Sequence, residues 1–221
     1  MKLKRNLVAL VLGLLVVLSV FLSWNDFHVL RMKAYSNPAG SMKPTLLVGD
    51  NVLVRRVFPA FGETYVPVAG DIIIFPLPGD PDNIYLKRLV GMPGDTIQMI
   101  DGVVHINGEP VKRERIDDFV EQSSSGDVRR VPRYRETLPN GVSFETLDLT
   151  TKSELDNTRE YVVPEGHLFT LGDNRDNSQD SRILSRVGYI PVDTVTGVAE
   201  QLYYSGKSKE FVWRPIEGDM E

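Results

Sequence analysis

The chain has 221 residues, 42% of them hydrophobic, a composition typical of one globular domain or two small ones. It contains no cysteine, which excludes a disulfide framework, a zinc ribbon, an iron–sulfur cluster and a thiolate nucleophile. It has 25 lysines and arginines and 30 aspartates and glutamates, and the first 24 positions hold three of the basic residues and none of the acidic ones. The rest of the chain therefore has a net charge of about −8 and is not expected to bind nucleic acid.

Residues 7–24 form the first predicted element, a transmembrane helix. Their sequence, LVALVLGLLVVLSVFLSW, carries no charge and would span about 27 Å as a helix, enough to cross the hydrocarbon core of a bilayer. Basic residues precede it and Asn25 and Asp26 follow it. The positive-inside rule therefore places residues 1–6 in the cytoplasm and residues 25–221 outside the cell membrane.

A cleavable secretory signal is the alternative interpretation of this segment, because it also begins with basic residues followed by an apolar run. Cleavage sites of such signals need small side chains. Phe21, Leu22 and Trp24 are bulky at the corresponding positions, which favours a retained anchor.

The chain after residue 25 reads as short β-strands separated by Gly and Pro, which predicts a mostly β fold of antiparallel sheets. The clearest signal is residues 96–106, where two apolar runs flank Asp101-Gly102. This pair suits a type I′ hairpin turn because both of its residues can adopt positive φ. Further strands are expected at residues 51–58, 71–75, 84–90, 159–164, 167–173 and 194–204.

Residues 111–158 differ from their surroundings because they are polar and charged, with only scattered apolar side chains. The run Ser123, Ser124, Ser125 and Gly126 lies within them and predicts a flexible stretch. We therefore expect an inserted small β-rich subdomain within the larger β domain.

No histidine lies in a dense polar cluster. His28 follows the apolar segment, His105 lies in the predicted hairpin and His167 in a predicted strand, so a structural or surface role is expected for each. A Ser-His-Asp triad therefore has no evident base, and the His/Glu patterns of zinc hydrolases are absent.

Ser41 is a candidate nucleophile. It lies in residues 37–50, on a turn constrained by Pro38 and Pro44, and such a turn can expose a hydroxyl group. Taken alone, the segment fits an ordinary serine in a Gly/Pro loop better than a nucleophile.

Lys87 is a candidate general base. In an alternating strand it shares a face with Tyr85 and Leu89, which places its amine among apolar neighbours. Burial disfavours the charged form of lysine and lowers its pKa, so the amine could accept a proton near neutral pH. The alternative is a lysine that extends to water from the edge of a sheet.

Residues 171–182, LGDNRDNSQDSR, hold three aspartates and two arginines. They do not fit a calcium-binding EF-hand loop, because counting from Asp173 places Arg175 at the third position and Ser178 where glycine is required. Mixed Asp and Arg side chains instead suit a hydrogen-bond network that fixes the backbone and orients neighbouring groups. Neither a metal nor another cofactor is expected.

These segments together resemble the bacterial type I signal peptidases, membrane-anchored Ser-Lys proteases that remove signal peptides from exported preproteins. The resemblance extends from about residue 36 to residue 190, and residues 111–158 lie outside the motifs that carry it. Its motifs, in the order of the family, are a GSMxPTL box at residues 40–46, a GDI strand at residues 70–75, a Y-x-KR-x-VG-x-PGD box at residues 85–95 and a GDNRDNSxDSR box at residues 172–182.

The resemblance implies that Ser41 is the nucleophile and Lys87 the general base. It also implies that Ser178 lies near the lysine, while Asp180 and Arg182 organise that neighbourhood. Such a lysine activates serine without histidine. The expected partners are preprotein signal peptides and the lipid bilayer, with no nucleic acid and no metal.

Signal-peptide cleavage sites need small side chains one and three residues before the scissile bond. We expect Pro38, Met42, Leu46, Ile72 and Leu86 to line the shallow pockets for them. At position 39, many family members have a serine whose hydroxyl helps to bind the oxyanion, whereas this chain has Ala39.

Three further interpretations stay open. The aromatic side chains Phe58, Phe61, Phe211 and Trp213 could contact the membrane interface or belong to the core. The chain could be a specialised peptidase of the same clan, such as a pilin-maturing enzyme or one with a narrow set of substrates. It could also be a non-catalytic anchored β domain that binds signal peptides or other proteins.

Overall fold

The computed structural model describes residues 31–58, 64–122, 126–216 and 219–220. The predicted anchor at residues 7–24, together with His28, Phe61 and Ser123–Ser125, lies outside these ranges. Within them, no helix has the length and apolar character needed to cross a membrane.

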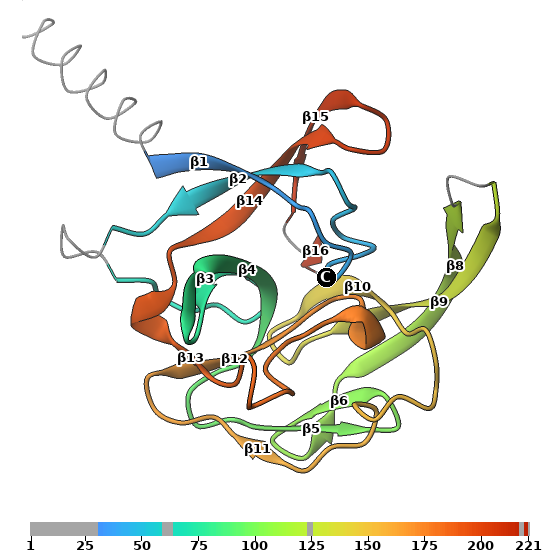
Figure 1. The fold of residues 1–221 in the computed structure, drawn as a ribbon. Helices are drawn as coiled ribbons and strands as arrows, with labels where there is room; N and C mark the ends of the chain where they lie inside the picture. Colours follow the sequence, from blue (N-terminus) through green and yellow to red (C-terminus); the bar gives the residue numbers. More distant parts are fainter. Residues whose placement is uncertain (1–30, 59–63, 123–125, 217–218, 221) are drawn as a thin grey trace, which may run out of the picture.

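The largest sheet contains the strands predicted at residues 51–58, 71–75, 84–90, 167–173 and 194–204, whereas those predicted at residues 96–106 and 159–164 lie in another sheet (Figure 1). Its strands pair antiparallel in the order β1 (Met32–Ser36), β2 (Asn51–Arg56), β14 (Gly197–Ser205), β3 (Ile72–Leu77), β4 (Asp80–Gly91), β12 (His167–Leu171) and β13 (Ile190–Pro191), and β15 (Glu210–Pro215) also pairs with β14. The run Ile72, Ile73, Ile74 and Phe75 is buried on both faces of β3, as expected of an inner strand.

Two smaller antiparallel sheets complete the described chain. One has the order β11 (Tyr161–Val162), β5 (Thr96–Ile100), β6 (Val103–Ile106) and β7 (Glu109–Pro110), and the other has the order β16 (Asp219–Met220), β10 (Val142–Leu147), β9 (Val128–Thr137) and β8 (Lys112–Gln122). The β5–β6 turn confirms the hairpin prediction, with φ of 48° at Asp101 and 75° at Gly102. The described residues also contain two 3-10 turns, η2 (Arg175–Asn177) after β12 and η3 (Val192–Thr194) after β13.

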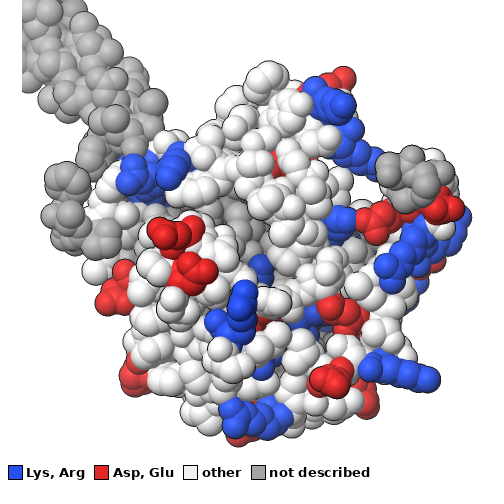
Figure 2. Space-filling model, in the orientation of Figure 1, with Lys and Arg blue, Asp and Glu red and all other residues white. Residues whose placement is uncertain are grey.

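Residues 111–158 supply the strands β8, β9 and β10 but share a core with the rest of the protein. Val111, Leu138 and Phe144 pack in one buried cluster with Phe169 of β12 and Ile97 of β5. The β8–β9 hairpin projects from the other strands (Figure 1), and Figure 2 shows basic and acidic side chains beside one another on it. The segment is therefore packed against the larger sheet through apolar contacts at the base of this hairpin.

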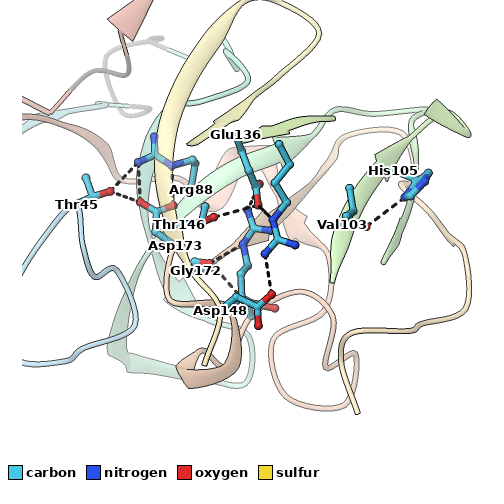
Figure 3. A network of polar contacts seen from close by, with 12 residues as sticks. Thr45, Arg88, Val103, His105, Glu136, Thr146, Asp148, Gly172 and Asp173 are labelled. Carbon is cyan, nitrogen blue, oxygen red and sulfur yellow. Dashed lines mark hydrogen bonds and ion pairs between the residues drawn. The ribbon is translucent and has the colours of Figure 1, made fainter. Parts of the chain in front are cut away.

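A buried polar network ties this segment to residues 172–182 (Figure 3). Glu136 of β9 has no exposed surface, and its carboxylate accepts hydrogen bonds from Thr146 at 3.1 Å and from Arg175 at 2.5 Å. Arg113 of β8 lies 3.5 Å from the same carboxylate and donates to Asp148 at 2.7 Å. Two guanidinium groups thus share the one negative charge of Glu136.

We expect Glu136→Gln to destabilise the fold by about 3–5 kcal/mol, because the change leaves the buried guanidinium group of Arg175 without its counter-ion while Arg113 keeps Asp148. Urea unfolding monitored by tryptophan fluorescence and circular dichroism measures this loss. The matched control is Glu145→Gln, which removes a partly exposed partner of Arg133 and is expected to change stability by less than about 1 kcal/mol. Equal stability of the two variants would contradict a structural role for the network.

Candidate active site

Residues 37–50 form a compact turn between β1 and β2. Its ends are joined by hydrogen bonds from the Asn37 amide to the Asp50 carbonyl at 2.7 Å and from the Gly49 amide to the Asn37 carbonyl at 2.8 Å. Ser41 lies near the middle of this turn and is partly exposed. The constrained, hydroxyl-presenting turn predicted around Ser41 is therefore present.

Asn174 fixes the orientation of the peptide bond that precedes Ser41. Its side-chain amide donates to the Gly40 carbonyl at 2.9 Å, and its backbone N–H donates to the Ser41 carbonyl at 3.0 Å. The C=O and N–H of a trans peptide point in opposite directions, so the Ser41 N–H points away from Asn174. This N–H has no hydrogen-bond partner among the described residues, which leaves it available to a ligand.

Lys87 of β4 reaches this turn from the largest sheet. Its Nζ donates to Ser41 Oγ at 2.9 Å and to the Leu86 carbonyl at 3.0 Å, and the residue is only 4% exposed. As predicted from alternation, Tyr85 and Leu89 lie on the same side of the strand, and Lys87 Nζ is 5.0 Å from the centre of the Tyr85 ring.

The surroundings of Lys87 make its amine a weaker base than that of an ordinary lysine. Burial lowers the pKa of Lys87 to about 8, although the carboxylates of Asp180 and Asp173 raise it. A substantial fraction of the amine is therefore neutral in mildly alkaline solution and can accept the proton of a hydroxyl group.

Asp180 and Arg182 form a buried ion pair close to the lysine. The Asp180 carboxylate accepts hydrogen bonds from Arg182 Nε and Nη2, both at 2.8 Å, and from the Gly172 amide at 3.0 Å. Burial alone raises the pKa of Asp180, but the charge of Arg182 and these hydrogen bonds outweigh burial and hold it below its ordinary value. The carboxylate is therefore ionised and stabilises positive charge on Lys87.

Ser178 packs against Gly172, and its Oγ is buried near the Asp180 carboxylate, whose pKa it helps to lower. No hydrogen bond links it directly to Lys87. A Cβ added at Gly172 would lie 2.2 Å from Ser178 Oγ and 2.7 Å from the Ser41 carbonyl oxygen. A glycine is thus required at position 172 to bring these two serines together.

A cavity of about 440 Å³ opens over Ser41 and Lys87. Pro38 and Leu86 line it, as predicted from the sequence. Its wall also contains residues that the sequence interpretation missed, among them Tyr35, Ile74, Asn83, Tyr85, Asn177 and Gln179.

The other predicted pocket residues are corrected by the structure. Met42, Leu46 and Ile72 are 0–3% exposed and belong to a core cluster rather than to the cavity wall. The strand register explains the position of Ile72, because Ile74 pairs with Leu86 beside Lys87 whereas Ile72 pairs with Arg88, farther along the strand. Spacing within one segment does not reveal that register.

Three carboxylates, those of Asp148, Asp156 and Asp176, offer oxygen atoms within 4.8 Å of one another and could hold a metal ion. One oxygen of each accepts a hydrogen bond, from Arg113 at Asp148, from two backbone amides at Asp176 and from the Ser153 amide at Asp156. The second oxygens of Asp148 and Asp176 are buried and have no partner among the described residues. Burial, followed by the neighbouring carboxylates, raises the pKa of Asp156. The expectation of no metal stays a prediction.

Comparison with known proteins supports the resemblance of the sequence motifs to those of the type I signal peptidases. Residues 5–204 match the family described as "Signal peptidase, peptidase S26". The signal peptidase I of Rickettsia typhi is 33% identical over 203 residues, which cover 81% of this chain and 75% of that protein. The signal peptidase I of Rickettsia bellii strain OSU 85-389 is also 33% identical over 203 residues, or 81% of this chain and 68% of that protein.

Among solved structures, a signal peptidase I from Enterococcus faecalis is similar to this chain at 28% sequence identity. The match covers 62% of this chain and 98% of that one with a TM-score of 0.36. Family membership is shown by the match over residues 5–204 and by the Rickettsia relatives. On these grounds the chain belongs to the signal peptidase family, peptidase S26.

Proposed function

We propose that this chain is a membrane-bound serine endopeptidase that removes signal peptides from exported preproteins, with Ser41 as nucleophile and Lys87 as general base. The observation that carries the proposal is the 2.9 Å contact between Lys87 Nζ and Ser41 Oγ, made by a lysine that is 4% exposed. A nucleophile within hydrogen-bond reach of a base is the arrangement that covalent acyl transfer requires.

In the first half of the reaction, Ser41 Oγ attacks the scissile carbonyl carbon while its proton passes to the neutral amine of Lys87. The carbonyl oxygen becomes an oxyanion, to which the free N–H of Ser41 can donate. When the tetrahedral intermediate collapses, the C–N bond breaks and the Lys87 ammonium protonates the departing amine. The mature protein leaves, and the signal peptide remains as an ester on Ser41.

In the second half, water replaces the departed amine. Lys87, again neutral, takes a proton from the water as its oxygen attacks the ester carbonyl. The second intermediate collapses with return of the proton to Ser41 Oγ, which releases the signal peptide with a new carboxylate. Asp180 and Arg182 position Lys87, and the charge of Asp180 stabilises the lysine each time it is protonated.

The cavity supports an extended substrate with small side chains next to the scissile bond. Residues 35–41 and residues 83–87 both contribute to its wall, with Pro38, Ile74 and Leu86 as apolar contacts. An extended peptide between such segments can form main-chain hydrogen bonds, while shallow pockets select small side chains.

Membrane attachment remains part of the proposal. Residues 7–24 would anchor the chain with residues 1–6 in the cytoplasm and the catalytic domain on the periplasmic side, in the same bilayer as the signal peptide. Phe211 and Trp213 are 75% and 70% exposed on β15, which supports contact with the membrane interface. Phe58 is partly buried, and the Arg56 guanidinium lies over its ring.

We expect Ser41→Ala and Lys87→Ala each to lower preprotein cleavage by about 10³-fold or more, because each removes a group that reacts in the first step. The measurement is cleavage of a preprotein by the detergent-solubilised full chain, followed by gel electrophoresis and mass spectrometry of the new N-terminus. The control variants Ser208→Ala and Lys152→Ala change exposed residues outside the cavity and should cleave normally. Equal cleavage by wild type and both dyad variants would exclude the proposed roles.

The rate should also depend on the ionisation of Lys87. Only the neutral amine can act as base, so kcat/KM should fall about tenfold for each pH unit below a pKa of about 8 and level off above it. A peptide substrate without groups that titrate in this range isolates the enzyme's own profile. A rate independent of pH between about 6 and 9 would show that a group other than Lys87 takes the proton.

A further inference from the structure

The tetrahedral intermediate on Ser41 carries a negative oxygen, and the described turn offers it one evident donor, the Ser41 N–H. Serine-based acyl transfer gains much of its rate from preorganised donors at this oxygen, and loss of one donor typically lowers the rate about 10²- to 10³-fold. The methyl group of Ala39, which lines the same cavity, cannot donate. A second donor therefore has to come from another element.

Asn177 lies on η2, which begins directly after Asn174, and the side-chain and backbone N–H groups of Asn174 bind the Gly40 and Ser41 carbonyls. The backbone N–H of Asn177 donates to the Asn174 carbonyl at 2.9 Å. A Cβ added at Gly40 would lie 3.3 Å from Asn177 Nδ2. Adding one carbon–carbon bond places this amide nitrogen within about 5 Å of the Gly40 Cα. Asn177 also lines the cavity together with Ala39, Ser41 and Lys87.

This position is compatible with joint binding of one oxygen. Two N–H donors that contact the same oxygen at about 3 Å each lie no more than about 6 Å apart. The nitrogen of Ser41 is bonded to the carbonyl carbon of Gly40, which is bonded to the Gly40 Cα. Asn177 Nδ2 lies close to the same Cα, so the two nitrogens are near each other. Asn174 donates to the Gly40 carbonyl, which points opposite to the Ser41 N–H in the same peptide, so this N–H stays free for the same oxygen.

The other polar side chains around the cavity are less suited to this role. The amine of Lys43, whose Cε is also 3.3 Å from the Cβ position at Gly40, is bound by Glu121. The Gln179 side chain is held by Tyr85 and Arg186 through its oxygen, and its amide nitrogen is not among the atoms nearest to the Cβ position at Gly40. The amide of Asn177 is exposed and makes no hydrogen bond to any residue in the described part of the chain, so it can turn toward a substrate oxygen.

We propose that Asn177 is a catalytic residue whose side-chain amide is the second oxyanion donor. This amide supplies the hydrogen bond that Ala39 cannot. The inference rests on the proposed function, because it requires an oxyanion formed on Ser41. The amide donates a hydrogen bond to the oxygen as negative charge develops and releases it when the carbonyl is restored. No proton is transferred in this contact.

The test compares wild type, Asn177→Ala, Ala39→Ser and the double variant in steady-state cleavage of a preprotein-derived peptide. Asn177→Ala should lower kcat on the order of a hundred-fold with KM changed less than about threefold, because the donor acts in the transition state. Ala39→Ser should raise kcat by a larger factor in the Asn177→Ala background than in wild type, because the two side chains supply the same kind of donor.

A peptide aldehyde provides the second measurement, since Ser41 adds to it and forms a tetrahedral adduct with an oxygen at the oxyanion position. Asn177→Ala should weaken aldehyde binding by about the factor lost in kcat/KM while leaving the affinity of an uncleavable substrate peptide unchanged. The matched control is Asn140→Ala, which removes an exposed amide outside the cavity. Equal melting temperatures show whether the variants are folded.

An unchanged kcat in Asn177→Ala would overturn the inference. So would equal effects of Ala39→Ser in both backgrounds, or a loss of aldehyde binding matched by an equal loss of substrate-peptide binding. These outcomes are separate from failure of the proposed function, which would appear as equal cleavage by wild type and Ser41→Ala in the same assay.

Discussion

The buried charges of residues 172–182 are balanced in part by residues on other strands, and the site depends on this balance. Asp173 receives two hydrogen bonds from Arg88 of β4, at 2.7 and 2.8 Å, and Arg175 donates to Glu136 of β9 at 2.5 Å. An unpaired ion in such surroundings is strongly unfavourable, so the loop is stable only when β4 and β9 are in place. Through Asn174, the same loop then holds the carbonyls of the nucleophile turn.

The same charges set the chemistry of Lys87. A fully apolar pocket would lower the pKa of a lysine further and leave its protonated form with little stabilisation. Here burial lowers the pKa, whereas Asp180 and Asp173 raise it, and the result is a pKa of about 8. An amine balanced in this way can take up a proton and release it again, as an acylation and deacylation cycle requires. The network of Figure 3 is therefore connected to the electrostatics of the candidate site as well as to stability.

Much of the local structure could be predicted because its causes lie within a few residues. Alternation along residues 84–90 indicated which side of the strand carries Lys87, and the Asp101-Gly102 pair indicated a hairpin turn that requires positive φ at both positions. The pocket wall could not be predicted in the same way. Ile72 was wrong as a lining residue because the pairing of β3 with β4 decides which isoleucine faces the cavity. Met42 and Leu46 were wrong because the turn that carries them packs them into the core. Residues 111–158 share their apolar contacts with strands distant in sequence, so composition could not reveal their common core.

The sequence by itself determined the candidate chemistry of this protein. A serine on a turn constrained by Gly and Pro, a lysine on an apolar strand face and an Asp/Arg-rich loop can each be recognised from neighbouring residues. The tertiary structure alone decided the 2.9 Å approach of Lys87 to Ser41, the carboxylates that hold the pKa of the lysine at about 8 and the position of Asn177 beside Gly40. The physical reason is that distances between remote segments and the loss of solvent around a charge exist only after strands and loops have packed together.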